Sequence, residues 1–424
     1  MDTPRPGVRS GVADPQVGST AVRWIRGLPA WAPYLLLASM IARLVWIFTT
    51  TNGFNVVDLH VYVECSATLR NDDLYDCTYS EDTPDFPLPF TYPPFAAMVF
   101  FPLHLLPFDA VVVAWQILTV AALFGVVRIA LELLGTGDHR IAALWTAGGV
   151  WTEPVRSTLD YGQVNVFLAL GVMLAVRSSR WWLSGLLVGV VGGIKLTPAV
   201  SGLYFAARRR WATVAWSAAV FAATVGLSYA IVGDEARRYF EHLLGDASRI
   251  GPVGSVFNQS LRGALSRIAG HDVGTSALWL SAVGVAVVLA VCAWRALRPD
   301  DRLGTILLVQ FLGLLISPIS WSHHWVWVIP LLVWLVHGPD WPQVGTKVVA
   351  AFWALDIVVG VPWLLGFFQP DIWTVSRPSL LAWLGTVNVV GTLLLFAWVI
   401  YLRRVRKSAA PAAYPALSGR LPSA

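Results

Sequence analysis

The chain has 424 residues, of which 56% are hydrophobic and only 13% are charged, and its mean hydropathy is +0.62. A water-soluble protein of this length would not need so much apolar surface, so the composition excludes the soluble enzyme classes. The 22 Trp residues fit a membrane protein, because indole rings concentrate at membrane interfaces. The composition therefore predicts an all-α polytopic membrane protein.

Apolar length and the distribution of Lys and Arg predict about twelve transmembrane helices, several of them too short to cross unless they are tilted or broken. The predicted spans cover residues 30–51, 110–134, 141–152, 164–176, 181–194, 197–207, 211–232, 277–297, 303–317, 325–336, 347–365 and 380–402. The first span lacks a small-residue cleavage site and is expected to stay as an anchor. Residues 91–108 are apolar but short and Pro-rich at both ends, which predicts a re-entrant or interfacial helix.

With this count, both termini and most basic residues of the short loops fall on the cytoplasmic side. These basic residues are Arg5, Arg9, Arg23, Arg26, Arg140, Arg177, Arg180, Arg208 to Arg210, Arg295, Arg298, Arg302 and Arg403 to Lys407. The predicted organisation is a cytoplasmic tail (1–29), one transmembrane domain (30–402) with external loops at 52–109 and 234–275, and a second tail (403–424). Both tails have the composition of solvated segments.

One loop departs from this charge rule. Residues 234–267 are external in the predicted topology but carry Arg237, Arg238, Arg249, Arg262 and Arg267. Longer loops obey the rule less well, and basic groups there could meet anionic headgroups or an anionic lipid substrate.

Five groups of polar residues interrupt the apolar pattern, and the predicted topology places all five on the external side. They are Asp58, the run 151–165, Lys195, Asn258 with Gln259, and His323 with His324. An ionisable group at the centre of a membrane helix costs about 2.5 to 3.5 kcal/mol on insertion scales, so such groups mark functional sites. Their convergence predicts an active site on the external face.

Asp58 follows the first span by a few residues and is preceded by the apolar Val56 and Val57. A carboxylate in such a partly desolvated place suits a general base. The alternative is an ordinary solvated loop carboxylate, because seven further acidic residues lie in the same loop. The membrane-edge position favours Asp58 among the acids, but the spacing alone weighs the two interpretations about evenly.

Lys195 lies between two half-length apolar segments, where Gly192, Gly193 and Pro198 permit a break in the helix. A Lys at a helix break suits a phosphate ligand. The alternative is that the side chain snorkels to the nearest interface. The place at the tip of a hairpin favours the phosphate interpretation.

The run 151–165 holds Glu153, Arg156 and Asp160, which would share one face of a helix and could neutralise one another instead of binding a substrate. Arg156, Gln163 and Asn165 are better candidates for hydrogen bonds to a sugar or a phosphate.

His323 and His324 stand beside Trp321 and Trp325 at an expected helix start. The imidazoles could donate to a phosphate or a sugar hydroxyl, with the indoles as apolar faces, although an interfacial His is more often structural. Tyr92 is expected to shape the segment 91–108, and Asn258 and Gln259 either bind hydroxyls or cap loops; for all three we favour structure.

No ligand spacing for a metal and no cofactor motif is found in the sequence, so neither is expected. Cys65 and Cys77 share the first external loop, where an oxidising environment would allow a disulfide, while Cys292 lies in a span. Two cysteines in one loop are a weak signal for such a bond.

Several short motifs occur in an order typical of one family. After the acid that follows the first span come YPP at 92–94, EP and GQVN within 153–165, GIKLTP at 193–198 and SPISWSHHWVW at 317–327. In this order the chain resembles actinobacterial membrane glycosyltransferases of the C-type (GT-C) fold, and among them those that use polyprenyl-phosphate-mannose as donor to form alpha-1,2 linkages on phosphatidylinositol mannosides. The resemblance runs from the first span to the last.

The resemblance implies a multi-pass plasma-membrane enzyme whose active site faces the periplasm and which needs no cofactor. It assigns Asp58 as the base that deprotonates the 2-hydroxyl of an acceptor mannose in one inverting displacement. We expect the donor phosphate to be held by Lys195, Arg156, His324 and His323. We expect sugar contacts from Glu153, Asp160, Gln163, Asn165, Tyr92, Asn258, Gln259, Trp321 and Trp325.

Two alternatives remain at this point. One is a sibling transferase that branches lipomannan or transfers arabinofuranose from its decaprenyl phosphate. The other is a lipid or sugar transporter, which would also place polar groups in broken helices, although the sequence shows no inverted repeat.

Overall fold

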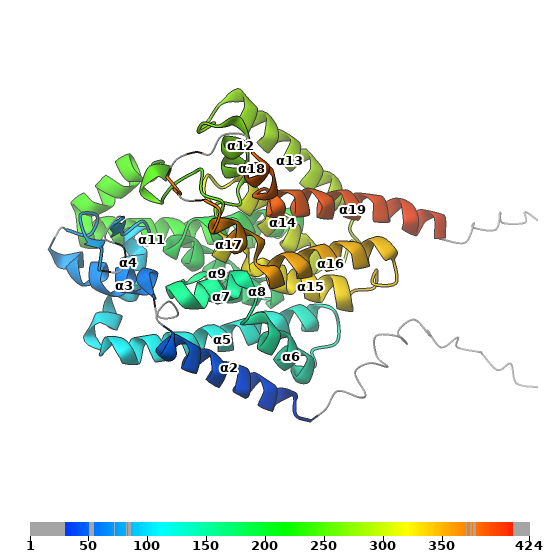
Figure 1. Ribbon diagram of the computed structural model, residues 1–424, viewed down its shortest axis with the longest axis horizontal. Coiled ribbons are helices and arrows are strands. Elements are labelled where there is room, and N and C mark those ends of the chain that lie inside the picture. The colour runs from blue at the N-terminus through cyan, green and yellow to red at the C-terminus, as the bar shows by residue number, and fades with distance from the viewer. Residues whose placement is uncertain are drawn as a thin grey trace, which may run out of the picture.

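The computed structural model describes residues 30–50, 55–71, 73–81, 83, 86–369, 371–373, 375 and 379–409, with side chains up to residue 406. In this part of the chain the structure is a bundle of helices, most of which run side by side along one direction (Figure 1). The exceptions are two-residue strands, β1 (Thr78–Tyr79) and β2 (Leu88–Pro89), which pair antiparallel. The helical class expected from the composition is confirmed.

Five helices of the described residues are long and apolar enough to cross a membrane. They are α2 (Ala32–Thr49), α5 (Phe108–Leu133), α11 (Trp211–Arg238), α13 (Ala277–Ala296) and α19 (Val387–Ala409). At 1.5 Å per residue the 26 residues of α5 extend over about 39 Å, more than the hydrocarbon core of a bilayer. The chain is thus a multi-pass membrane protein.

Shorter helices fill the remaining predicted spans. They are α6 (His139–Gly149), α7 (Glu153–Tyr161), α8 (Asn165–Arg177), α9 (Trp181–Ile194), α10 (Gly202–Ala207), α14 (Arg302–Ile316), α15 (Val328–His337), α16 (Val344–Val359), α17 (Val361–Gly366) and α18 (Leu380–Leu384). Helices α7 and α8 meet at a bend of 118° and count as a sixth span if taken together. The count of about twelve stays a prediction.

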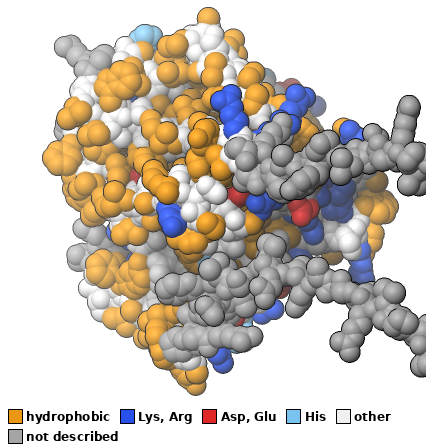
Figure 2. Space-filling view, turned by 90° about the vertical axis from the view of Figure 1, so that its right-hand side faces the viewer, with side chains coloured by type: hydrophobic (Ala, Val, Ile, Leu, Met, Phe, Trp, Pro, Cys, Tyr) orange, Lys and Arg blue, Asp and Glu red, His pale blue; other side chains and the backbone are white. Residues whose placement is uncertain are grey.

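One end of the bundle carries the basic residues of the short loops. The first residue of α2 and the last of α19 both lie at this end (Figure 1), and the view onto it shows many Lys and Arg side chains with few acidic ones (Figure 2). Arg298 and Arg406 both pair with Asp340 here, at 3.1 and 2.5 Å. The predicted tail 1–29 lies outside the described residues, and so does most of the predicted tail 403–424, of which residues 403–409 continue α19.

The first external loop folds at the opposite end, where α2 finishes. It contains the short helix α3 (Val57–His60), the π-helical turn η1 (Val61–Cys65) and a disulfide between Cys65 and Cys77. Residues 91–108 form α4 (Pro94–Phe100) and the turn η3 (Phe101–Leu105), so the predicted short helix is present. It begins at Pro94, where the fixed φ of proline suits a first helical turn and its missing N–H costs nothing.

Gly162 makes the bend between α7 and α8 possible. Its φ of 71° is in the left-handed region, and a Cβ there would lie 2.5 Å from Cβ of Leu59. Only glycine meets both demands at low cost. The bend therefore lets α3 pack directly against the end of α7.

The second external loop uses its arginines mostly for structure. Arg238 holds Asp76 through two hydrogen bonds of 2.6 and 2.7 Å, and Arg262 holds Asp272. Arg267, in α12 (Leu261–Ala269), is fully buried and donates to the carbonyls of Ser255, Asn258 and Gly385. The expectation that these groups meet an anionic lipid is therefore wrong for Arg267, because backbone carbonyls take its charge.

Candidate active site

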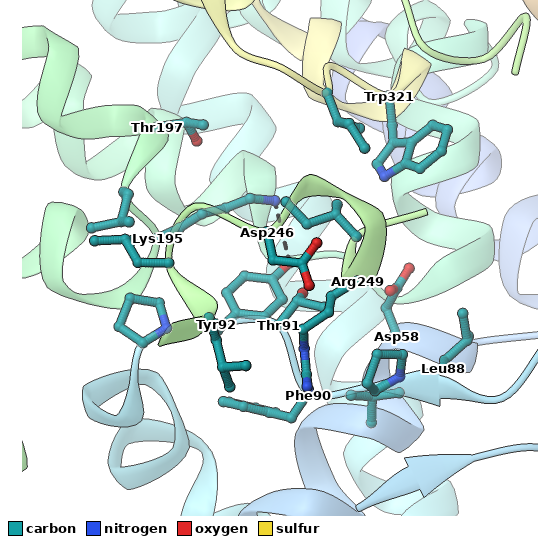
Figure 3. A pocket seen from close by; sticks show the side chains of 18 of the residues that line it. Asp58, Leu88, Phe90, Thr91, Tyr92, Lys195, Thr197, Asp246, Arg249 and Trp321 are labelled. Carbon is teal, nitrogen blue, oxygen red and sulfur yellow. Dashed lines mark hydrogen bonds between the residues drawn. The ribbon is translucent and has the colours of Figure 1, made fainter. Parts of the chain in front are cut away.

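A cavity of about 260 Å³ opens at the end of the bundle opposite to the basic end. It is lined by residues from four of the five polar groups that the sequence singles out, and Figure 3 shows two of them, Asp58 and Lys195. Those lining residues are Asp58, Gln163, Lys195 and His324, joined by the predicted Tyr92 and Trp321. Segments far apart in the chain thus meet at one site.

Lys195 stands where α9 stops. Its backbone is extended (φ −145°, ψ 130°), and the turn η4 (Thr197–Ser201) follows with Pro198 near its start, so the helix cannot continue. The ammonium Nζ lies 2.9 Å from Oδ1 of Asn165 and 3.2 Å from both the Tyr92 hydroxyl and Nε2 of His324. These three partners are neutral, so the positive charge remains available to an anionic ligand.

Two tyrosines and a glutamine connect Lys195 to the other side of the cavity. The Tyr92 and Tyr62 hydroxyls lie 2.7 Å apart, and both donate to Oε1 of Gln163, at 3.1 and 3.0 Å. The side chain of Gln163 also acts on Asp58, whose pKa it lowers. A hydrogen-bonded chain thus runs from Lys195 through Tyr92 to Gln163, on the side of the cavity where Asp58 lies.

Asp58 is half-buried in the first turn of α3. The residue before that helix, Val56, has a φ of 28°, which is costly for a β-branched residue, and its N–H donates to the Asp160 carbonyl at 2.7 Å. Burial raises the pKa of Asp58 to about 6, against the lowering effects of Gln163 and the Lys195 charge. A carboxyl with this pKa is ionised at neutral pH yet accepts a proton readily, which suits a general base.

The two adjacent histidines point in different directions. His324 lines the cavity, whereas His323 is buried beside Tyr161 and its carbonyl accepts from Asn165 and Thr158. Burial and the nearby Lys195 ammonium hold the pKa of His324 well below its ordinary value. The imidazole is therefore neutral, accepts from Lys195 at Nε2 and keeps its proton on Nδ1.

Three charged residues predicted to contact substrate lie outside the cavity lining. Asp160 forms an ion pair with the buried Arg43 of α2, and Arg156 stacks over the Trp363 ring at 4.6 Å. Glu153 is buried under Gly360. These residues occupy the face of α7 that turns toward α2 and α16, so the structure does not bring Arg156 to the cavity.

Asn258, Gln259 and Trp325 are likewise turned away from the cavity. The fully buried Asn258 amide donates to the carbonyls of Val253 and Pro318 and accepts from two N–H groups, which uses all four of its hydrogen-bonding positions. The buried Gln259 amide donates to the carbonyls of Val256 and Gly385 and accepts from the Asn388 N–H, and Trp325 packs in the core against Trp353. The backbone of Asn258 forms an antiparallel bridge with Trp321, and its side-chain Oδ1 accepts from the neighbouring Ser320 N–H, so Asn258 helps to place Trp321 at the cavity wall.

Sequence reasoning missed part of the wall. Tyr75, Tyr239, Asp246 and Arg249 also line the cavity. The only signal for them was Arg249 among the unexplained basic residues of the second loop. Within the described ranges no three His, Cys, Asp or Glu side chains gather in a way that could hold a metal ion.

The chain is similar in sequence to several known proteins. Residues 90–318 match the model of glycosyltransferase family 87. A Mycolicibacterium smegmatis protein named polyprenol-phosphate-mannose-dependent alpha-(1-2)-phosphatidylinositol pentamannoside mannosyltransferase is 58% identical over 88% of this chain and 92% of its own length. A Mycobacterium tuberculosis protein of the same name is 54% identical over 87% of this chain and 86% of its own.

A third relative, also from M. tuberculosis, is named as the corresponding phosphatidylinositol mannoside mannosyltransferase and is 32% identical over 75% of this chain and 78% of its own length. No solved structure matches the chain. The family match covers more than half of the chain, and two relatives are similar over nearly all of it. The chain belongs to glycosyltransferase family 87.

Proposed function

We propose that the protein transfers mannose from polyprenyl-phosphate-mannose to the 2-hydroxyl of a terminal mannose on a phosphatidylinositol mannoside, forming an alpha-1,2 linkage. The observation that carries this proposal is that one cavity is lined both by a carboxylate, Asp58, and by an ammonium, Lys195, whose hydrogen-bond partners are neutral. The names of the similar proteins supply the donor and acceptor classes.

In this reaction Asp58 takes the proton of the acceptor 2-hydroxyl. The oxygen forms a bond to the anomeric carbon of the donor mannose while the bond from that carbon to the phosphate oxygen breaks. One displacement inverts the anomeric centre, so a beta-linked mannosyl phosphate gives an alpha product. A positioned base of this kind is typically worth about 10² to 10⁴ in rate.

The leaving group determines what the other end of the cavity must do. The donor phosphodiester carries one negative charge, and the departing polyprenyl phosphate gains a second. A cation that is fixed where this charge develops stabilises the transition state more than the ground state. Lys195 fits this role, with the Nδ1 proton of His324 as a second donor.

The cavity opens at the end of the bundle away from the basic loops, and by the charge rule that end faces the periplasm. We place the site on the outer face of the plasma membrane in a GT-C-type fold. A lipid-linked donor is needed on that side because nucleotide sugars are not available there. The transporter alternative has no support from the family or the cavity.

The test is mannose transfer by the purified protein in lipid nanodiscs. Synthetic polyprenyl-phosphate-mannose and decaprenyl-phosphate-arabinose are each offered with a phosphatidylinositol mannoside acceptor, beside the variant Asp58→Asn. We expect transfer from the mannose donor only, and its loss in a variant with an unchanged melting temperature. Transfer from the arabinose donor instead would refute the substrate assignment, and full activity of Asp58→Asn would refute the mechanism.

A further inference from the structure

Two charged residues of the cavity wall have no part in the proposed reaction. Arg249 and Asp246 come from the second external loop, next to the turn η6 (Ala247–Arg249), and both line the cavity (Figure 3). Arg249 is half-buried and Asp246 is exposed, which places the pair near the mouth. Trp321 lines the same cavity from another segment.

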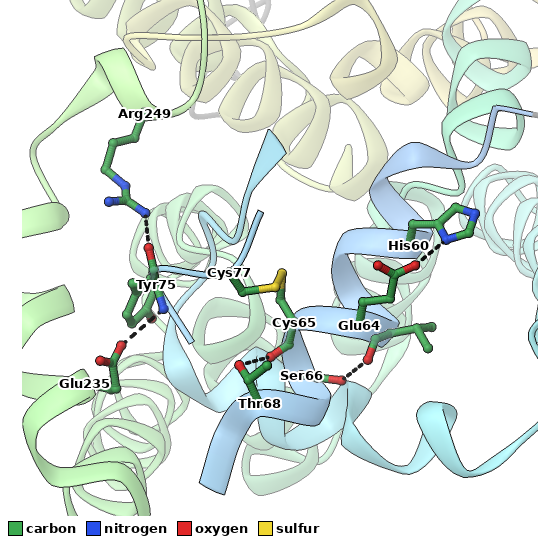
Figure 4. Close-up of a disulfide and its surroundings, with 10 residues drawn as sticks. His60, Glu64, Cys65, Ser66, Thr68, Tyr75, Cys77, Glu235 and Arg249 are labelled. Atoms are coloured by element: carbon green, nitrogen blue, oxygen red, sulfur yellow. Dashed lines mark hydrogen bonds and ion pairs between the residues drawn. A yellow bond between two sulfur atoms is a disulfide. The ribbon is translucent and has the colours of Figure 1, made fainter. Parts of the chain in front are cut away.

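The position of Arg249 is fixed by a built support (Figure 4). One Nη donates to the Tyr75 carbonyl at 3.1 Å. Tyr75 is itself held by its N–H to Glu235 at 3.2 Å, by its hydroxyl to the Tyr92 carbonyl at 2.9 Å and by the disulfide two residues later. A guanidinium that is held in place beside a cavity is prepared for a ligand, because little rotamer entropy remains to be lost.

Much of the hydrogen-bonding capacity of this pair is left over. Arg249 carries five N–H donors, and the bond to Tyr75 is the one it makes to a described residue. Oδ1 of Asp246 accepts from the N–H and hydroxyl of Ser248, and an ionised carboxylate has about four acceptor positions, so some remain for a ligand. The pair therefore offers both donors and an acceptor to a ligand.

Charge decides between the two ligand classes that Arg249 could meet. A phosphate would be attracted by Arg249 but repelled by the carboxylate three residues earlier, so the pair has no net charge to offer an anion. A hexose is neutral and presents neighbouring hydroxyls that both accept and donate. Its apolar C–H face suits an indole such as that of Trp321.

We infer that Arg249, Asp246 and Trp321 form the subsite that binds the sugars preceding the reacting mannose of the acceptor, and that Arg249 is the residue that makes the longer mannoside bind more tightly than a single mannose. This inference rests on the proposed function, since it concerns the acceptor of the same site. Within the described residues, Arg249 is not among the hydrogen-bond partners of the Lys195 ammonium, which are Asn165, Tyr92 and His324, so the two cations can be tested separately.

Binding, rather than transfer, is the decisive measurement, because it tests the subsite even if the proposed reaction fails. Calorimetry on the protein in nanodiscs compares an octyl mannoside with the octyl glycoside of an alpha-linked mannose trisaccharide, and farnesyl phosphate serves as the anionic probe. We expect the wild type to bind the trisaccharide about tenfold more tightly than the monosaccharide, as a few new hydrogen bonds would give.

Arg249→Ala should remove this tenfold preference and leave the dissociation constants of octyl mannoside and farnesyl phosphate unchanged. Arg249→Lys should not restore it, because an ammonium cannot bind two hydroxyls in a fixed fork. The matched control is Arg237→Ala, an exposed arginine of the same loop region outside the cavity lining. Asp246→Asn replaces Arg249→Ala if the latter does not fold, since an amide oxygen still caps Ser248.

Equal binding of the two glycosides by the wild type would overturn the inference. A variant that weakens both glycosides alike, or that weakens farnesyl phosphate instead, would overturn it as well. Failure of the proposed function shows separately, as an absence of mannose transfer by a wild type that still prefers the trisaccharide.

Discussion

Asp58 with Lys195 and Asp160 with Arg43 are two pairs of opposite charges that the fold treats differently. In the second pair the ions touch, and the guanidinium is buried between α2 and α7. In the first pair Gln163 and Tyr92 stand between the ions, and both ions line a cavity.

The difference separates structural charges from charges available to a ligand. A buried cation whose partner is a carboxylate has its field cancelled and serves to fix the packing of two helices. A buried cation whose partners are a hydroxyl, an amide and a neutral imidazole keeps its field. Of these two cations, Lys195 lines the cavity and Arg43 does not. We therefore assign the chemistry to Lys195 and Asp58.

The largest expected effect is on catalysis by Asp58 and Lys195, the pair whose charges are not in contact. Lys195→Met keeps the length of the side chain but removes the charge, and should lower kcat by about 10² to 10³, the typical cost of removing one stabiliser of a developing anion. The measurement is single-turnover transfer at saturating donor.

Lys195→Arg is the matched control for that experiment. It keeps the charge and should recover part of the rate, whereas equal losses in both variants would mean that the position matters only for packing. Unchanged kcat in Lys195→Met would contradict the assignment of Lys195 to the leaving phosphate.

The ion pair of Arg43 with Asp160 should instead control the stability of the fold. Arg43→Met leaves the Asp160 carboxylate without its partner and should cost about 3 kcal/mol of folding free energy, visible as a lower melting temperature in detergent. Transfer per folded molecule should stay near the wild-type rate, because Arg43 is outside the cavity lining.

The double variant Arg43→Met with Asp160→Asn should regain much of that stability, since removing both charges is far cheaper than removing one. A double variant that melts no higher than the single one would show that the ion pair is not the cause. A large loss of specific activity in Arg43→Met would remove the distinction between the two pairs.

Much of the fold could be predicted from apolar length. Helix α9 was expected at residues 181–194 and is found at Trp181–Ile194. Helix α11 was expected to end at Val232, but after a kink at Val232 and Gly233 it continues to Arg238. The sequence prediction stopped there because a polar stretch looks like a loop, whereas a helix outside the hydrocarbon has no need of apolar residues.

The site was predictable where a charge interrupts an apolar run and not where it lies in a polar loop. Lys195 and Asp58 stood out by context, and both line the cavity. Arg249 did not, because its place depends on a bond to Tyr75, 174 residues earlier in the chain. Trp321 and Trp325 looked alike in the sequence, yet only Trp321 faces the cavity, since small differences in orientation decide which indole is buried.

A third variant would give Lys195 a carboxylate in direct contact, as Arg43 has in Asp160. Asn165→Asp places a carboxylate where an amide oxygen now lies 2.9 Å from the Lys195 ammonium. Its charge should compete with the donor phosphate and raise the donor KM about tenfold, the effect of 1.4 kcal/mol.

Asn165→Ala removes the same hydrogen bonds, including the one to the His323 carbonyl, without adding charge. It should raise the donor KM less than Asn165→Asp does. If the two variants raise the donor KM equally, the lost hydrogen bonds rather than the added charge explain the effect. The neutral partners of Lys195 would then not be what keeps its charge available to the donor.

The smallest effect concerns the pH at which Asp58 works. The base must be ionised, so kcat/KM for the acceptor should rise with pH through a pKa of about 6. The bond from Gln163 lowers that pKa, so Gln163→Leu should move the acid limb to higher pH, by less than about one unit. At pH 6 the variant should then be slower than the wild type, and at pH 8 the two limbs should have levelled off.

Gln116→Leu is the matched control, because Gln116 donates to the Leu159 carbonyl of α7 but lies outside the cavity lining. A limb that stays in place in Gln163→Leu, or that moves equally in Gln116→Leu, would mean that the amide between the two charges does not tune the base.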